Sequence, residues 1–317
     1  MYQNHFSFDQ MPFTLSSGPE MLLALPGFQS AWNVLEYARV RGEGVAVVTG
    51  DPGCGKSLLI RTFAQHADEH LVLGVIHNPE LLEENLWFGL AEAFQMDGAD
   101  MPRKSLTSDL QHALRQHVTE GRQVMLIIDE AQYLSNGVLE RLRLFMNGDY
   151  QSERIMQLVL VGQNELKPLL FRPENKQLRQ RVLFTCHLGP LSFEGTRDYI
   201  DHRLEAAGAR DEVFSPSAVE LVFRASSGIP RLINVICDMA LLYGYAEHAR
   251  RIDVDVMKEV VADRNLFDGR TALIGLGHGA GQLQPVVSGS GRHVMQSDDR
   301  DIARQLFNLP SGNRESR

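Results

Sequence analysis

Residues 50–57 constrain the fold of this chain more than any other segment. They read GDPGCGKS and match the pattern GxxxxGK[ST] without a mismatch. The run 45–48 before them is apolar and short, as in a buried strand, and residues 56–66 have the pattern of a helix. A glycine-rich turn between a strand and a helix lets backbone N–H groups converge on phosphate, and the helix N-terminus adds positive potential. We therefore predict a nucleotide-phosphate site at this turn.

Two side chains of this turn have expected roles. Lys56 is expected to contact the β- and γ-phosphates of ATP, and the Ser57 hydroxyl is expected to bind Mg²⁺. At Cys54 we expect the backbone to matter more than the thiol. The predicted nucleotide-binding residues are Gly50, Asp51, Pro52, Gly53, Cys54, Gly55, Lys56, Ser57 and Leu58. The alternative is a glycine-rich turn without a ligand, and the strand and helix around the motif argue against it.

Two adjacent carboxylates follow a second apolar run. Residues 124–128 read VMLII, and Asp129 and Glu130 come directly after them. Ligands gather at the carboxyl ends of strands in open parallel sheets. We expect Asp129 to hold the Mg²⁺ shell and Glu130 to orient and polarise an attacking water. The pair favours hydrolysis of ATP over binding alone.

A third apolar run, 158–161, leads into the polar residues GQNE. A polar side chain at this point is expected to reach the γ-phosphate or the attacking water, between the two motifs. Gln163 is the first candidate and Asn164 the second. The alternative is a polar turn at a strand end that has no part in the chemistry.

Short apolar runs alternate with amphipathic stretches through the first 190 residues. The runs lie at 45–48, 71–76, 124–128, 158–161 and 183–186. Amphipathic stretches lie between them at 81–94, 108–118 and 138–146, and a helix-like stretch at 31–40 precedes the first run. Apolar runs without alternation are typical of central strands covered on both faces of a parallel sheet. The order predicts a doubly wound α/β domain.

The pattern changes after residue 190. Four stretches then look helical, at 194–207, 215–225, 230–247 and 253–262. Glycine, serine and polar residues rise beyond them, which indicates a flexible tail. We predict a nucleotide-binding domain at 1–190, a helical domain at 191–266 and a tail at 267–317.

Charge and cysteine content limit the partners and the compartment. The formal net charge is -9, which argues against a protein that coats nucleic acid through bulk charge, although a local basic patch could still bind DNA. The three cysteines are far apart and indicate neither a disulfide framework nor a zinc site. No apolar run approaches the ~18 residues of a membrane span, and the first residues do not read as a secretory signal. We expect a soluble, cytoplasmic protein without a direct membrane span.

The segments GDPGCGKS, LIIDEAQ, LVGQNEL, LRQRV and SGIPRLIN occur in this order and are similar to those of AAA+ ATPases of the general secretion pathway protein A (ExeA/GspA) type. The resemblance covers residues 1–266. It implies a P-loop AAA+ fold, with a parallel sheet flanked by helices and followed by a small helical lid. Longer members carry a membrane segment and a peptidoglycan-binding region after this module, and neither is visible here, which weighs against a direct role in remodelling the cell wall.

The resemblance also implies roles for two arginines. Arg181 has the place of an arginine finger that reaches the γ-phosphate of a neighbouring subunit, with Arg179 as the alternative. Arg231 resembles the sensor arginine carried by the helical lid. Both would neutralise charge that develops on the transferred phosphoryl group. A finger that acts between subunits requires an oligomer of this chain.

The first hypothesis is an ATP hydrolase that works as an oligomer and drives assembly or remodelling of a partner complex, in secretion or the cell envelope. The second is an ATP-dependent DNA-binding regulator that recruits a transposase, which would bind double-stranded DNA in a salt-sensitive way. A scaffold that binds ATP without turnover and a kinase are weaker alternatives, because Asp129 and Glu130 fit hydrolysis better. ATP and Mg²⁺ are the only cofactors that we infer.

Overall fold

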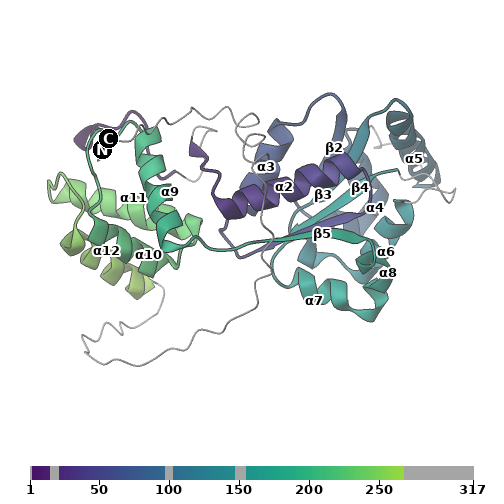
Figure 1. Cartoon of the computed structure of the whole chain (residues 1–317). Coiled ribbons are helices and arrows are strands. Elements are labelled where there is room, and N and C mark those ends of the chain that lie inside the picture. The colour runs from purple at the N-terminus through teal and green to yellow at the C-terminus, as the bar shows by residue number, and fades with distance from the viewer. Residues whose placement is uncertain (1, 15–20, 97–102, 147–154, 268–317) are drawn as a thin grey trace, which may run out of the picture. The chain divides into compact units, whose positions relative to one another are not determined.

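The computed structural model describes residues 2–14, 21–96, 103–146 and 155–267 (Figure 1). These residues all belong to one compact unit, Met1–Thr271. The predicted tail lies outside the described residues except for Phe267, the last residue of a helix. The domain boundaries at 190 and 266 stay predictions.

Within the described residues, the five predicted strands form one parallel sheet. The strands are β1 (Val45–Gly50), β2 (Leu71–Ile76), β3 (Gln123–Ile128), β4 (Gln157–Gly162) and β5 (Val182–Leu188). Their order across the sheet is β2-β3-β4-β1-β5, so β4 lies between the strand that enters the glycine-rich turn and the strand that carries the two carboxylates. The carboxyl ends of β1, β3 and β4 therefore lie at one edge of the sheet.

Strand β5 differs from the expectation of a central strand. It lies at the edge of the sheet, and its side chains alternate between exposed and partly buried positions up to Leu188. The apolar run at 183–186 does not predict this alternation, because Leu183 is apolar but exposed. The next residue, Phe184, stacks on Tyr37 with ring centroids 6.3 Å apart.

Helices follow the strands in alternation, as predicted. They are α2 (Pro26–Arg41), α3 (Lys56–Gln65), α4 (Glu80–Ala93), α5 (Arg103–Thr119), α6 (Asn136–Phe145), α7 (Leu166–Phe171) and α8 (Lys176–Arg179). Local signals set several of their ends. Ser135 caps α6 by accepting a hydrogen bond from the Val138 N–H, and Gly42 ends α2 in the left-handed conformation at φ 63°.

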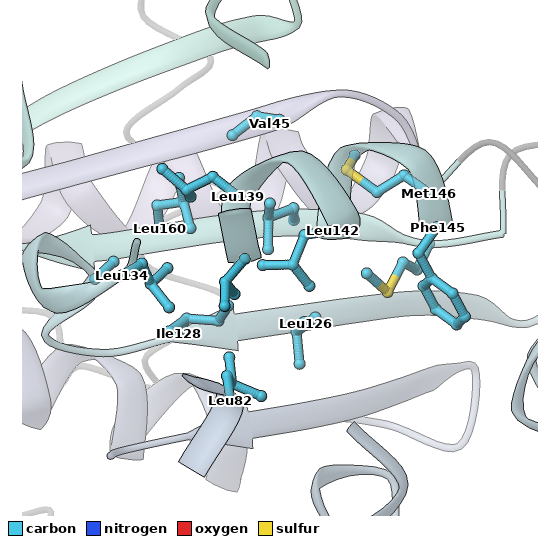
Figure 2. Packing of buried hydrophobic residues seen from close by; sticks show 14 of the residues in the cluster. Val45, Leu82, Leu126, Ile128, Leu134, Leu139, Leu142, Phe145, Met146 and Leu160 are labelled. Carbon is cyan, nitrogen blue, oxygen red and sulfur yellow. The ribbon is translucent and has the colours of Figure 1, made fainter. Parts of the chain in front are cut away.

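One core fills the space between the sheet and helices α4–α8. Leu126 and Ile128 of β3 pack there with Leu139, Leu142 and Met146 of the α6 segment (Figure 2). The sequence pattern predicts these three helical residues as core, and all of them are buried. Because side chains alternate along a strand, residues between those of this cluster face the other side of the sheet, where α2 and α3 contact β1. The sheet is thus covered on both faces.

Both tryptophans pack against buried side chains, Trp32 fully buried and Trp87 partly. Trp32 of α2 is 1% exposed and lies edge-on to Phe63 of α3, with ring centroids 5.5 Å apart. Trp87 of α4 is packed against the main core and lies 5.3 Å from the Phe145 ring.

A second core lies among the helices after β5. These are α9 (Phe193–Ala206), α10 (Pro216–Ser226), α11 (Pro230–Ala246) and α12 (Val254–Phe267). The four predicted helices are confirmed, and α12 continues beyond its predicted end at 262. Ser192 and Ser215 cap α9 and α10 with their side chains.

The N-terminal segment contributes to this second core. Its buried residues Phe6, Phe8 and Phe13 share a cluster with residues of α9–α12. The guanidinium of Arg203, on α9, donates to the carbonyl oxygens of Pro12 at 2.5 Å and of Thr14 at 2.8 Å. The chain's first residues therefore pack with its last described helices, which the sequence pattern does not reveal.

Candidate nucleotide site

The glycine-rich turn joins the end of β1 to the start of α3. Gly53 and Gly55 have φ angles of 84° and 99°, in the left-handed region that other residues rarely adopt. Gly55 precedes the first helical residue, Lys56, so the turn ends where the helix N-terminus begins. The turn therefore needs glycine at these two positions to present backbone N–H groups near the helix start.

The Lys56 ammonium lies inside the turn. It donates to the carbonyl oxygens of Gly50 at 2.8 Å and of Asp51 at 3.1 Å, and the residue is only 6% exposed. Carbonyl oxygens on the turn hold the positive charge close to the place that the sequence predicts for phosphate. A phosphate bound there would replace these neutral acceptors with charged ones.

Ser57 and Asp129 meet at the end of the sheet. The Ser57 hydroxyl donates to Oδ2 of Asp129 at 2.9 Å, and Oδ1 of Asp129 accepts the Glu130 N–H at 2.9 Å. Asp129 is 3% exposed. A hydroxyl oxygen and a carboxylate oxygen are the hard donors that Mg²⁺ prefers, and Mg²⁺ is held by few protein ligands when phosphate supplies others. The residues present fit this ion.

Glu130 follows Asp129 in a left-handed backbone conformation, with φ 51° and ψ 34°. Its Oε2 accepts hydrogen bonds from the side-chain amides of Gln132, at 2.6 Å, and of Gln163, at 3.3 Å. The first sequence candidate at the end of β4, Gln163, therefore lies in contact with Glu130.

Asn164, the second candidate at the end of β4, contacts the other motif. Its Nδ2 donates to Oδ1 of Asp51, in the glycine-rich turn, at 2.8 Å. Neighbouring residues of one loop thus reach the turn and Glu130 separately, because β4 lies between β1 and β3.

Comparison with known proteins agrees with this geometry. A family model described as an AAA domain matches residues 39–170. The chain is 35% identical over 253 residues to general secretion pathway protein A of Aeromonas hydrophila, which covers 80% of this chain and 46% of that protein. The chain is an AAA+ protein that resembles general secretion pathway protein A. It spans less than half the length of that relative.

A second relative and a solved structure extend the comparison. The ATP-dependent target DNA activator B of Escherichia phage Mu is 33% identical over 135 residues, or 43% of this chain and 39% of that protein. The ORC2 protein of Aeropyrum pernix, solved as ADPNP-ADP complexes, matches with a TM-score of 0.60 at 15% identity, over 80% of this chain and 72% of that one. The match to the ORC2 structure shows the fold, which is that of the P-loop AAA+ proteins.

Arg231 of this AAA+ protein lies near the turn. It is the second residue of α11, and its backbone N–H donates to the Gly53 carbonyl oxygen at 3.2 Å. A Cβ built on Gly53 would lie 2.9 Å from Cβ of Arg231, so the start of α11 and the turn are in close contact. The Arg231 side chain is exposed beside the predicted phosphate site.

Arg181 lies at the amino ends of the strands, opposite the end that carries the glycine-rich turn. Its carbonyl oxygen accepts the N–H of Val45, the first residue of β1, whereas the turn follows the last one. A strand of this length rises about 3.3 Å per residue, which places the Arg181 backbone about 20 Å from the turn. Arg179 nearby donates to the Phe171 carbonyl oxygen at 3.2 Å and lies over the Phe171 ring. The structure brings neither arginine to the site of its own chain.

The remaining predicted residues differ in exposure. Cys54 is buried, and this burial, with Asp51 nearby, raises the pKa of its thiol, so the neutral form is favoured at pH 7. Leu58 is 40% exposed. One residue in contact with Glu130 is absent from the sequence-based candidates, namely Gln132. Gln132 ends the LIIDEAQ segment, two residues after Glu130, but polar residues after a strand are too common to single it out.

Proposed function

We propose that this AAA+ protein binds ATP with Mg²⁺ and hydrolyses it. The observation that carries the proposal is the hydrogen bond between Ser57 and Asp129, with Glu130 next to it. Three side chains from two segments lie together at the end of the sheet, two of them proposed to hold the metal ion and one to act on the attacking water. Lys56 completes the set from within the turn.

Each side chain has a part in the proposed reaction. Lys56 leaves its carbonyl acceptors and neutralises charge on the β- and γ-phosphates, and the backbone N–H groups of the turn hold the same oxygens. Ser57 and Asp129 would hold Mg²⁺, which would neutralise negative charge on the phosphates. Glu130 orients and polarises the attacking water. Gln163, which donates to Glu130, contacts the γ-phosphate or the attacking water.

Oligomer formation belongs to the same proposal. Arg181 lies too far from the turn of its own chain to act there, so as a finger it must enter the site of another copy. Arg179 is the less favoured finger because it is held on Phe171. We assign Arg231 to the site of its own chain, at the start of α11, with residues 191–266 acting as a lid over the nucleotide.

The proposed role is to drive assembly or remodelling of a partner complex in secretion or the cell envelope. The similarity to general secretion pathway protein A over 80% of the chain supports it. In the described part of the chain, no helix has the length and apolar character to cross a membrane. We propose that the protein acts in the cytoplasm, where ATP is available.

The second candidate is an ATP-dependent DNA-binding regulator that recruits a transposase. The similarity to the target DNA activator of phage Mu, 33% identity over 135 residues, supports it. This candidate requires binding to double-stranded DNA that depends on ATP and weakens with salt, because phosphate contacts release counterions.

The test is ATP hydrolysis measured together with mass in solution, with and without ATP and double-stranded DNA. Glu130→Gln and Arg181→Ala are the matched variants. ATP-driven oligomers, trapped by Glu130→Gln and indifferent to DNA, would support the first role. A strong increase by DNA of both the hydrolysis rate and the mass in solution would support the second role. No turnover and a constant mass would refute hydrolysis and leave a nucleotide-binding scaffold.

A further inference from the structure

Gln132 connects Glu130 to the end of strand β4. It belongs to a short 3₁₀ turn, Ala131–Tyr133, directly after Glu130. We propose that Gln132 is a positioning residue for Glu130: its amide holds one carboxylate oxygen and leaves the other for the attacking water. This inference rests on the proposed hydrolysis of ATP.

The partners of Gln132 fix the orientation of its amide. Oε1 accepts the backbone N–H of Gln163 at 2.9 Å, and Nε2 donates to Oε2 of Glu130 at 2.6 Å. A flipped amide would set oxygen against the carboxylate and NH₂ against the N–H, so both hydrogen bonds would be lost. The side chain is therefore a bridge with one allowed direction, from the β4 backbone to Glu130.

The two oxygens of the Glu130 carboxylate have different surroundings. Oε2 accepts from both Gln132 and Gln163. Among the described residues, Oε1 accepts no hydrogen bond. The left-handed backbone of Glu130 is uncommon for a residue with a long side chain, and such conformations persist only where the surroundings hold them. The two amides supply that hold and determine which oxygen faces away from them.

Gly162 leaves the room that Gln132 occupies. A Cβ built on Gly162 would lie 2.5 Å from Oε1 of Gln132, closer than real contacts allow, and 3.3 Å from both the Gln132 nitrogen and Cδ2 of Leu166. The closest atom is the end of a side chain, which can move away. A methyl group at position 162 therefore displaces the Gln132 amide without altering either glutamine, which offers an independent test.

The first variant is Gln132→Glu. The new carboxylate keeps the shape and can still accept the Gln163 N–H, but it repels Glu130 where the amide donated to it. We expect kcat to fall about tenfold to a hundredfold, as for a reacting group displaced by about 1 Å, with KM for ATP and the melting temperature unchanged. Because a protonated carboxyl at position 132 can donate again, the ratio of wild-type to variant kcat should shrink as pH falls from 8 to about 5.5.

The matched control is Gln116→Glu. On the exposed face of α5, Gln116 donates to Oε1 of Glu120 at 2.9 Å, so the same change creates the same kind of like-charged pair away from the site. We expect no change in kcat or in its pH profile. Gly162→Ala should lower kcat as Gln132→Ala does, and the double variant should be no slower than Gln132→Ala, since the methyl group then meets no amide.

Each outcome decides the inference. A reduced kcat with unchanged KM supports it, as does recovery of kcat in Gln132→Glu at low pH. It is also supported if the effects of Gly162→Ala and Gln132→Ala do not add in the double variant. If the wild type hydrolyses ATP and Gln132→Glu has the same kcat, this inference is overturned while the proposed function stands. A fall in melting temperature and in ATP affinity that accounts for the lost rate also overturns it, because Gln132 would then be a structural residue. Wild-type protein without turnover refutes the proposed function, and the inference fails with it.

Discussion

The hydroxyl of Ser57 donates to Oδ2 of Asp129 across 2.9 Å, which joins the first turn of α3 to the end of β3. The two residues lie 72 positions apart in the sequence. Their oxygens are brought together because β1 and β3 end at the same edge of a parallel sheet.

Ser57→Ala should weaken Mg²⁺-dependent binding of ATP. Removal of the hydroxyl takes away one oxygen donor and leaves Asp129 without its partner, and a loss of about tenfold to a hundredfold in affinity is typical when a metal's supporting residue is removed. Calorimetric titration of ATP with and without Mg²⁺ measures it. Ser57→Thr retains the hydroxyl and should bind normally. Equal affinity of Ser57→Ala and wild type in Mg²⁺ would show that this hydroxyl does not hold the ion.

Arg181→Ala and Glu130→Gln should each abolish turnover alone and recover part of it when mixed. In a mixed oligomer, an Arg181→Ala subunit supplies an intact Glu130, and a Glu130→Gln neighbour supplies an intact Arg181. Loss of an arginine finger lowers kcat by about 10³-fold or more, so recovery stands out clearly. Steady-state ATP hydrolysis across mixing ratios measures it. Mixtures that stay inactive although they co-assemble would refute action between subunits.

Arg224→Ala is the control for the arginine series. Arg224 lies on α10 with 70% of its side chain exposed and pairs with Glu220 on the same helix. An exposed pair of this kind contributes about 0–1 kcal/mol to stability, and neither residue belongs to the predicted nucleotide site. Turnover of Arg224→Ala should match the wild type.

Arg203→Met should lower the free energy of unfolding by about 2–3 kcal/mol, because one buried and one partly buried carbonyl acceptor lose a charged donor. Arg203 is 4% exposed and holds Pro12 and Thr14 on the helical core. Urea unfolding followed by circular dichroism measures the change. On the same helix, Arg197→Ala removes an exposed pair with Asp198 and should stay within about 0.5 kcal/mol of the wild type. Equal effects of the two variants would contradict the role of Arg203.

Cys54 should react slowly with iodoacetamide at pH 7.5. Burial raises the pKa of its thiol above the ordinary value of 9.0, so a smaller fraction is thiolate at this pH than in an unfolded chain. The rate should keep rising beyond pH 9, where an ordinary thiol begins to level off. Peptide mapping of alkylated protein, native and in guanidinium chloride, measures both. A native rate at pH 7.5 that equals the unfolded rate would contradict this prediction.

The strands and the motif at their ends were predictable from the sequence. Apolar runs such as 158–161 have no polar position that could face water, and their short length favours a buried central strand. The glycine-rich turn is equally local, because Gly53 and Gly55 adopt backbone angles that depend on residue type. The prediction of a central strand at 183–186 was wrong, because the exposed Leu183 of edge strand β5 is as apolar as a buried residue.

The sequence by itself determined which residues can take part in nucleotide chemistry, since their types and their places after strands are local properties. Only the tertiary structure decided which of them meet. The order β3-β4-β1 brings Gln163 to Glu130 and Asn164 to Asp51, and it makes Gln132 a bridge to β4. The parallel sheet separates Arg181 from the turn of its own chain. Such distances depend on strand order and on packing between distant segments, which no local pattern encodes.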